Sequence, residues 1–226
     1  MSMEVRRIDK KLAEKVVSEK HYSRRLGIFW EGFGLYLEGL LLGVVCYGQP
    51  SAPIQKHAFT NRDFRLYELT RLVVDSNVAN GASMLIGRSL QMLSVRPAAV
   101  ISYADSAHGH AGIVYQATNW IYTGPVVSHD KLYLLDGVPT HPMTLRDRLG
   151  VTEPSKWARD NGIASVKPSP KHRYFQFVGD RRQVRSMRAR LAYPPVSEYP
   201  KSEKTTYDAG APCFVVAAID APDSKR

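Results

Sequence analysis

The sequence predicts an α/β protein with a mixed central sheet that helices flank, followed by a basic C-terminal extension. Patterns typical of strand, helix, strand, helix and strand follow one another from residue 69 to residue 127, which predicts a crossover unit with at least two parallel strands. Residues 167–204 hold ten Lys or Arg against three Asp or Glu, or +7 of the total charge of +10. We expect one domain over residues 1–226, with its core at about 1–136 and a basic substrate-binding part at about 140–204.

The N-terminal segment is expected to hold a helix and a hairpin. Asp9 suits an N-cap, and apolar residues spaced four apart predict a helix from there to Lys20. Residues 29–37 and 40–47 have strand character, and Glu38-Gly39 between them suits a tight hairpin turn. Residues 49–64 are mostly polar and are expected to form a loop.

The middle of the chain alternates between strands and helices. Residues 69–75 and 98–103 read as strands, and a turn-rich stretch between them opens a helix near Ser83. A short helix is expected over residues 109–119 and a further strand over 120–127.

The C-terminal part is expected to be more irregular. A strand is predicted at residues 131–135, two short helical pieces within 144–161, and another strand at 173–178. Asp180 then suits the N-cap of a helix whose arginines face outward, and residues 213–219 form a last candidate strand.

Composition narrows the functional classes. The longest apolar stretch, residues 40–47, is far shorter than the roughly 20 residues that span a bilayer, so no membrane partner is expected. The N-terminus lacks the apolar run of a signal peptide, and the two cysteines, Cys46 and Cys213, are expected to be buried free thiols. We therefore expect a cytoplasmic protein, in the host cytoplasm if a phage encodes it. The oligomeric state stays open, a homodimer included.

The basic C-terminal part favours a nucleic acid as partner. Arginines of the helix after Asp180 would hold phosphates, and the aromatic residues interleaved with basic ones at 171–177 could stack on an unpaired base. The candidate DNA-binding residues are Lys171, Arg173, Arg181, Arg182 and Arg185. The alternative is that these charges form an ordinary solvated surface.

Two further segments carry candidate chemistry. Asn80, Gly81 and Ser83 precede or open a helix, whose N-terminus can bind a phosphate through free N–H groups, although an ordinary capped helix explains them equally well. Asp105 and Ser106 follow a buried strand, at the end of a sheet where α/β proteins place their ligands. Asp105 would act as general base or metal ligand and Ser106 as hydrogen-bond donor; helix capping is the structural alternative.

Three aromatic or imidazole side chains are less specific. His21 and Tyr22 end the first helix and could bind a metal or a polar substrate, although no zinc motif surrounds them. Tyr115 could donate a proton to a leaving thiolate, or simply pack in the core.

Taken together, these segments resemble the Mom family of bacteriophage DNA-modification proteins. The resemblance extends from about residue 15 to residue 200 and is carried by a combination of short motifs rather than by one of them. The motifs are His21-Tyr22-Ser23, Glu68-Leu69-Thr70-Arg71-Leu72, Ser102-Tyr103-Ala104-Asp105-Ser106 with Gly109 and Gly112, Tyr115-Gln116-Ala117-Thr118-Asn119, and Lys171-His172-Arg173-Tyr174.

The resemblance implies an N-acetyltransferase-related (GNAT-like) fold whose acyl-CoA cleft opens between the strand around residues 71–74 and the strand ending at Tyr103. The family converts adenine in duplex DNA to N6-carbamoylmethyladenine, which protects phage DNA from host restriction. Acetyl-CoA, or another small-molecule donor, and an iron ion are implied as cofactors. By position, His21, Tyr22 and Asp105 match the residues associated with iron, while Arg71, Tyr115 and Tyr36 match others that are important for modification.

The implied cofactor-binding residues are Arg71, Leu72, Val73, Asn80, Gly81 and Ser83. Reaching adenine in a duplex implies base flipping, for which Trp30, Tyr36 and Trp120 are candidate stacking residues, with core packing as the alternative for each. Two other functions remain open: an ordinary N-acetyltransferase acting on a protein or a small amine, and a DNA-binding protein without enzymatic activity.

Overall fold

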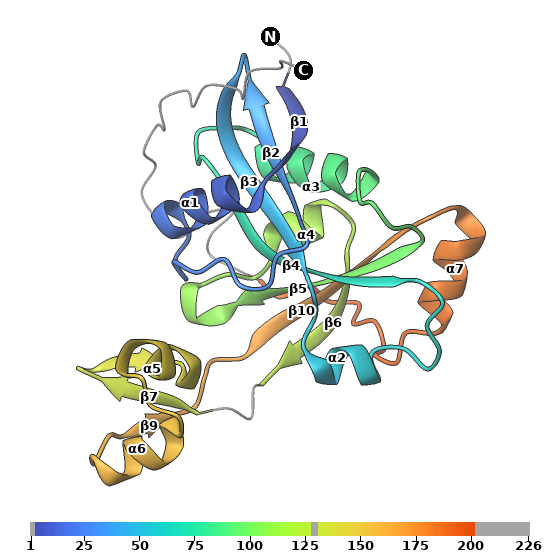
Figure 1. Cartoon of the computed structure of the whole chain (residues 1–226). Helices are drawn as coiled ribbons and strands as arrows, with labels where there is room; N and C mark the ends of the chain where they lie inside the picture. Colours follow the sequence, from blue (N-terminus) through green and yellow to red (C-terminus); the bar gives the residue numbers. More distant parts are fainter. Residues whose placement is uncertain (1–2, 128–130, 202–226) are drawn as a thin grey trace.

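A computed structural model describes residues 3–127 and 131–201 of the chain (Figure 1). Its strands form two sheets, and helices connect many of the strands. In chain order they are β1 (Met3–Ile8), α1 (Lys10–Lys20), β2 (Glu31–Leu37), β3 (Leu40–Gly48), α2 (Ala52–His57), β4 (Arg65–Val74), α3 (Gly81–Gln91), β5 (Ala98–Asp105), the 3-10 turn η1 (Ser106–His108), α4 (Ile113–Ala117), β6 (Ile121–Val126), β7 (Leu132–Leu135), β8 (Val138–Thr140), α5 (Pro142–Leu149), α6 (Pro154–Asp160), β9 (Ser165–Val166), β10 (Lys171–Val178) and α7 (Arg181–Ala189).

The main sheet has the order β1-β2-β3-β4-β5-β10-β6. Its neighbouring strands are antiparallel except β4 and β5, which are parallel and are connected through α3. The mixed sheet and the crossover unit are therefore confirmed. β10 comes from the basic C-terminal part but lies between β5 and β6, so that part also supplies a strand inside the main sheet.

Helices cover both faces of this sheet. α3 and α4 pack against one face, which holds the largest core cluster. The opposite face is shared: α1 covers the β3–β4 half, while α2 and α7 cover the half around β5 and β10. Successive strand residues alternate between the two faces, so Val100 faces α3 and α4 whereas Ala99 and Ile101 face α2 and α7.

Several local predictions are confirmed by the geometry of caps and turns. The Asp9 carboxylate accepts a hydrogen bond from the Leu12 N–H at 2.8 Å and begins α1. Glu38 and Gly39 join β2 to β3 with φ values of 51° and 84°, as a tight hairpin turn requires. Asp180 forms a capping box with Gln183 at the start of α7.

Other segments differ from expectation. β1 was not predicted, and the expected loop at residues 49–64 contains α2. The helix expected over residues 109–119 is reduced to α4, because Gly109 and Gly112 have φ values of 69° and 76°, which interrupt a right-handed helix. Cys46 is a buried free thiol as expected, whereas Cys213 and the strand expected at 213–219 lie outside the described residues.

A small second sheet, β8-β7-β9, lies between β6 and β10 in the sequence, and α5 and α6 belong to the same subdomain. Figure 1 shows this subdomain beside the main sheet, at the lower left. Its own core contains Tyr133, Leu145 and Ala158. The Arg25 guanidinium, in the segment after α1, forms a 2.8 Å ion pair with Asp147 of α5 and so joins the subdomain to the main body.

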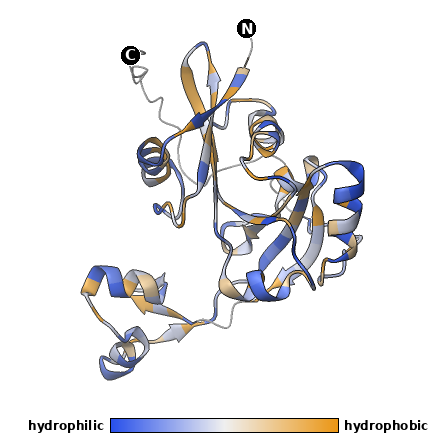
Figure 2. Ribbon diagram, turned by 45° about the vertical axis from the view of Figure 1, so that its right-hand side comes forward, coloured by the Kyte–Doolittle hydropathy of each residue, from blue (hydrophilic) through white to orange (hydrophobic). Residues whose placement is uncertain are grey.

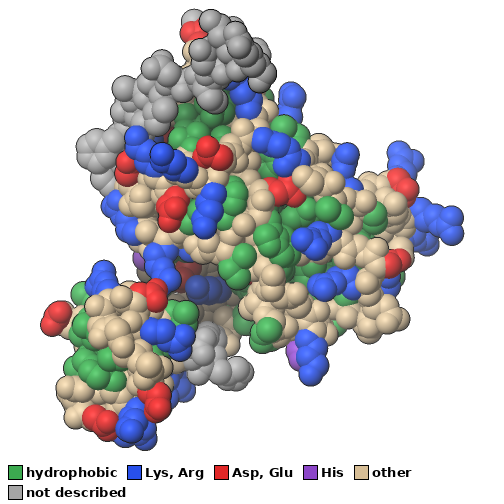
Figure 3. Space-filling model, viewed as in Figure 1, with side chains coloured by type: hydrophobic (Ala, Val, Ile, Leu, Met, Phe, Trp, Pro, Cys, Tyr) green, Lys and Arg blue, Asp and Glu red, His purple; other side chains and the backbone are tan. Residues whose placement is uncertain are grey.

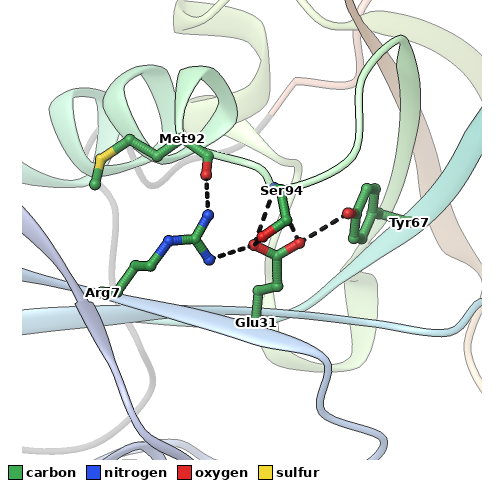
Figure 4. A network of polar contacts seen from close by, with 5 residues as sticks. All are labelled: Arg7, Glu31, Tyr67, Met92 and Ser94. Carbon is green, nitrogen blue, oxygen red and sulfur yellow. Dashed lines mark hydrogen bonds and ion pairs between the residues drawn. The ribbon is translucent and has the colours of Figure 1, made fainter.

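A polar network holds the first strands to the end of α3 (Figure 4). The Glu31 carboxylate accepts hydrogen bonds from Arg7 at 2.6 Å, from the Tyr67 hydroxyl at 2.7 Å and from the Ser94 hydroxyl at 2.9 Å. Arg7 also donates to the Met92 carbonyl.

Among the described residues, no helix is long and apolar enough to cross a membrane.

Candidate functional site

The candidate site is the gap that opens where β4 and β5 stop pairing. Their ladder joins four residues of each strand and ends at the pair Glu68–Ile101. Beyond this point β4 continues to Val74 and β5 to Asp105, and a pocket lies between the two continuations. The pocket holds about 690 Å³ of empty space, its open mouth included.

The pocket is lined from both faces of the sheet. His21 and Tyr22, from the end of α1, contribute to one side, and the segment from Gly109 to Tyr115 contributes to the other. Leu69 to Leu72 and Ser102 to Ala104 form its walls. Residues that are distant in the sequence but belong to the family motifs therefore meet in one cavity.

Ser102 stands at the vertex of the gap. Its hydroxyl lies 3.0 Å from the Leu69 carbonyl and 2.8 Å from the Tyr115 hydroxyl, and the Ser102 side chain is buried. One serine proton cannot serve both oxygens, and the carbonyl can only accept. When Ser102 donates to Leu69, Tyr115 donates to Ser102; when Ser102 donates to Tyr115, the tyrosine proton is available elsewhere. Burial raises the pKa of Tyr115, so this hydroxyl stays protonated at neutral pH.

His21 is buried and neutral. Burial first, and then the nearby charges of Arg71, His110 and His108, lower its pKa to about 3. The Ser23 backbone N–H donates to His21 Nδ1 at 3.1 Å, and this contact assigns the ring proton to Nε2. The Tyr22 ring packs against the His21 and His108 rings, with centroid distances of 4.2 and 4.0 Å.

Arg71 carries a fixed positive charge into the pocket wall. Burial lowers the pKa of Arg71, but the ordinary pKa of arginine is so high that the guanidinium remains charged at neutral pH. Its Nε donates to the Arg25 carbonyl and its Nη1 to the Thr70 carbonyl. These bonds hold Arg71 beside Tyr22 and Glu68, whose charges contribute to its pKa.

Asp105 and Ser106 occupy the end of β5 but do not line the pocket. Asp105 caps η1 by accepting the Ala107 N–H at 3.0 Å, and its other oxygen forms a 3.2 Å ion pair with Lys171. The Ser106 hydroxyl donates to the Pro170 carbonyl. Both side chains thus make the capping and turn contacts that were the structural alternative for them.

The expected iron ligands do not fit a metal ion as they are arranged. His21 Nδ1 accepts a backbone N–H, both Asp105 oxygens have partners, and burial raises the pKa of Tyr22, which disfavours a phenolate. Within residues 3–127 and 131–201, no group of three or more His, Cys, Asp or Glu side chains is placed to hold a metal.

The remaining cofactor candidates are spread along the end of β4 and the start of α3. Leu72 lines the pocket, whereas Val73 is buried under α1. Asn80 is the N-cap of α3 with a φ of 57°, and Gly81 and Ser83 lie in its first turn. Tyr36 lies on β2, where the Arg6 guanidinium sits 5.2 Å from its ring centroid, and it does not line the pocket.

Three candidate stacking or DNA-binding residues are engaged in contacts within the protein. Trp120 is fully buried beside Tyr115, and Trp30 packs under Arg65 at 4.1 Å, so both have core or packing contacts. Arg173 bonds to Thr123 and lies 3.5 Å from the centroid of the Tyr193 ring.

The arginines of α7 are free to meet a partner. Arg181, Arg182 and Arg185 are exposed, and Arg181 and Arg185 line a shallow groove with Arg188. The ribbon of α7 is mostly hydrophilic in Figure 2, and Figure 3 shows Lys and Arg side chains projecting at the right-hand edge, over this helix.

Sequence reasoning gave no site role to Ser102, Tyr103 and Glu68, although all three lie within the motifs of the resemblance. The first two line the pocket. Burial raises the pKa of the Glu68 carboxyl to about 7, although the nearby charges of Arg71 and Lys171 and the Ser51 N–H lower it. An acidic residue inside the strand pattern of β4, three residues before Arg71, was the available signal for Glu68.

Comparison with known proteins finds a relative in sequence and distant likenesses in fold. The methylcarbamoylase Mom of Escherichia phage Mu is 30% identical over 183 residues, which cover 77% of this chain and 75% of the phage Mu protein. Distant likenesses in fold include the spermidine/spermine N-acetyltransferase SpeG of Vibrio cholerae, with 10% identity and a TM-score of 0.44 over 78% of this chain and 95% of that one. Arabidopsis thaliana NAA60 in complex with acetyl-CoA gives 11% identity and a TM-score of 0.45 over 78% and 99%.

The main sheet has helices on both faces and a gap between its two parallel strands, which is the mixed α/β architecture that was expected. The profile of the Mom protein family matches residues 2–201, which is nearly all of the chain. On this match and on the 30% identity to the phage Mu protein, the chain belongs to the Mom protein family.

Proposed function

We propose that the protein is a DNA-modifying transferase that converts adenine in duplex DNA to N6-carbamoylmethyladenine. The observation that carries this proposal is the meeting of His21, Tyr22, Arg71 and Tyr115 in one pocket between the separated ends of β4 and β5. These four residues match the functional positions of the Mom resemblance and come from β4, from α4 and from the segment that follows α1. A shared fold would not by itself place all four of these side chains in the same cavity.

The acyl donor that we propose is a CoA thioester. The pocket runs between two parallel strands, and the chain leaves the end of β4 through a turn that begins α3. The first N–H groups of an 11-residue helix can bind a diphosphate, with Asn80, Gly81 and Ser83 at the point of approach. The thioester end of the same molecule would then lie in the pocket beside Arg71 and Leu72.

The side chains of the pocket supply binding and hydrogen-bond donors. Arg71 holds a positive charge near the acyl group, and the protonated Tyr115 hydroxyl can donate to an oxygen or sulfur that gains negative charge. His21 contributes its Nε2–H as a second neutral donor. Relative to adenine and acetyl-CoA, the product has one N6–H bond and one methyl C–H bond replaced by the new N6–C bond, which removes two electrons, and the thioester C–S bond replaced by an amide C–N bond with release of CoA thiol. The reaction therefore also takes an oxidant and an ammonia-level nitrogen donor as co-reactants.

The duplex would be held partly by α7. β10 spans eight residues, from Lys171 at the pocket end to Val178, which leads into α7. At about 3.3 Å per residue, this strand separates the pocket from the arginines by roughly 23 Å. That distance corresponds to roughly seven base pairs at about 3.4 Å each, so α7 can hold phosphates of the same duplex away from the target base.

Protection of plasmid DNA tests this function. Plasmid from bacteria that express the protein should resist restriction endonucleases whose sites contain adenine. Tyr115→Phe and Arg71→Ala should abolish the resistance, whereas Arg88→Ala, on the exposed side of α3, should retain it. Full digestion of plasmid from cells that hold folded wild-type protein would overturn the proposal.

A further inference from the structure

A polar and aromatic cluster lies on the sheet face opposite α3 and α4, directly beside the pocket. Its members are Glu68 on β4, Tyr103 on β5, Arg173 on β10, and Tyr193 in the segment after α7. Glu68 is two residues beyond Leu66, which faces α2 and α7, and Tyr103 and Tyr193 pack against the same core cluster. Tyr103 also lines the pocket, so the cluster and the pocket adjoin.

The aromatic part of the cluster is held in place. The Arg173 guanidinium lies 3.5 Å from the centroid of the Tyr193 ring, and its Nε donates to the Thr123 hydroxyl at 2.8 Å. The centroid of the Phe175 ring lies 6.0 Å from that of the Tyr193 ring. Tyr193 is partly exposed, and the ring face away from the Arg173 guanidinium is the surface on which a flat ligand can stack.

The acidic part of the cluster is unusual because its carboxyl is half-buried and has the Ser51 backbone N–H, rather than a cationic side chain, as its hydrogen-bond donor. Among the residues that the structure describes, no ion pair or side-chain hydrogen bond holds Glu68. Arg71 of the same strand, Lys171 of β10 and the Ser51 N–H face it, and Tyr103 lies beside it. Burial outweighs these groups and raises the pKa of Glu68 to about 7, so the neutral acid is well populated at physiological pH.

We propose that Glu68, Tyr103, Arg173 and Tyr193 form the subsite that receives the unpaired target base, a 6-aminopurine, with Glu68 binding its N1 and N6 edge. In its neutral form the carboxyl has one O–H donor and one carbonyl acceptor. Adenine presents the complementary pair: N1 accepts and the N6 amine donates. The Tyr193 ring supplies the stacking surface, and the bound amine faces the pocket that Tyr103 also lines.

This inference rests on the proposed function for the identity of the ligand, but its test needs no chemical reaction. The probe is a short fluorescein-labelled oligothymidine that carries one adenine, one 1-deazaadenine (no N1 acceptor) or one purine (no amine). Fluorescence anisotropy at pH 6 gives the affinity of each. We expect the wild type to bind the adenine strand several-fold more tightly than either analogue, since one hydrogen bond contributes about 1 kcal/mol.

Three variants connect this preference to the cluster. Glu68→Ala should bind all three strands equally, whereas Glu68→Gln, whose amide also has one donor and one acceptor group, should keep the adenine preference. Raising the pH to 8.5 should reduce the preference for adenine over 1-deazaadenine in the wild type but not in Glu68→Gln. Tyr193→Ala should weaken all three strands about tenfold, as loss of one stacking platform does.

Glu14→Ala, at an exposed position of α1, serves as the matched control and should behave as the wild type. Equal wild-type affinity for the three strands, or an adenine preference that survives in Glu68→Ala, would overturn the subsite. Failure of the proposed function would instead appear as unmodified DNA together with an intact, Glu68-dependent preference. The two failures are therefore distinguishable.

Discussion

Removal of the Glu31 carboxylate should destabilise the protein strongly, because this side chain joins β2 to β4 and to the segment after α3. The side chain is 10% exposed and accepts hydrogen bonds from Arg7, from the Tyr67 hydroxyl and from both the N–H and the hydroxyl of Ser94. In Glu31→Ala the Tyr67 hydroxyl, on a residue that is 1% exposed, loses its acceptor.

The magnitude follows from these contacts. A hydrogen bond to a charged group contributes about 1.5–3 kcal/mol, and leaving a buried donor unpaired costs a similar amount. Arg7 is 48% exposed, so its ion pair adds little. The bonds from Tyr67 and Ser94 therefore set the loss at about 3 kcal/mol, which lowers Tm by roughly 9 °C for a domain of this size.

Urea denaturation of Glu31→Ala measures this loss, with Glu4→Ala as control because the Glu4–Arg6 pair on the neighbouring strand is exposed. Burial by itself would raise the pKa of Glu31, but its hydrogen bonds outweigh burial and lower the pKa below 4.5. Its stabilising contribution is therefore complete above pH 4.5 and is lost as the pH falls through the lowered pKa. A Glu31→Ala variant as stable as Glu4→Ala at pH 7 would refute this reasoning.

Three further results are expected. Gly112→Ala should lower the free energy of unfolding by about 2–4 kcal/mol, as measured by thermal unfolding, because φ is +76° and an added Cβ would lie 2.5 Å from the Tyr174 ring. The control Gly39→Ala, at φ +84° with open space around the position, should lose only the contribution of backbone strain. Tyr115→Phe should lower DNA modification about a hundredfold or more in single-turnover assays while Tm changes little, unless its hydroxyl has no part in the reaction. Arg182→Ala should reduce the slope of log affinity for duplex DNA against log salt by about one, and an equal effect of Arg88→Ala would contradict a specific role for α7.

The parts of the fold that local chemistry decides could be predicted from the sequence. Asp9 begins α1 as an N-cap, and the turn at Glu38-Gly39 closes the hairpin, because each depends on a few neighbouring residues. The position of β10 inside the sheet depends on pairing with β5 and β6, far away in the chain, and no local pattern encodes it.

The site, like the fold, could be predicted only in part from the sequence. His21, Tyr22, Arg71 and Tyr115 were identified through a family pattern, and the fold brings them together. Ser106 was the predicted hydrogen-bond donor because it follows the strand. The serine that reaches the pocket is Ser102, four residues earlier, because the β4–β5 ladder ends just before it. Which serine faces the gap depends on where the two strands separate, and that is a property of the tertiary structure.

The most direct test of the proposed function is mass spectrometry of nucleosides from plasmid DNA recovered after the protein is expressed in bacteria. We expect an adenosine species that is heavier by one carbamoylmethyl group and absent from cells that express Tyr115→Phe. Unmodified adenosine, in cells where folded wild-type protein is confirmed, would contradict the account and favour an ordinary N-acetyltransferase.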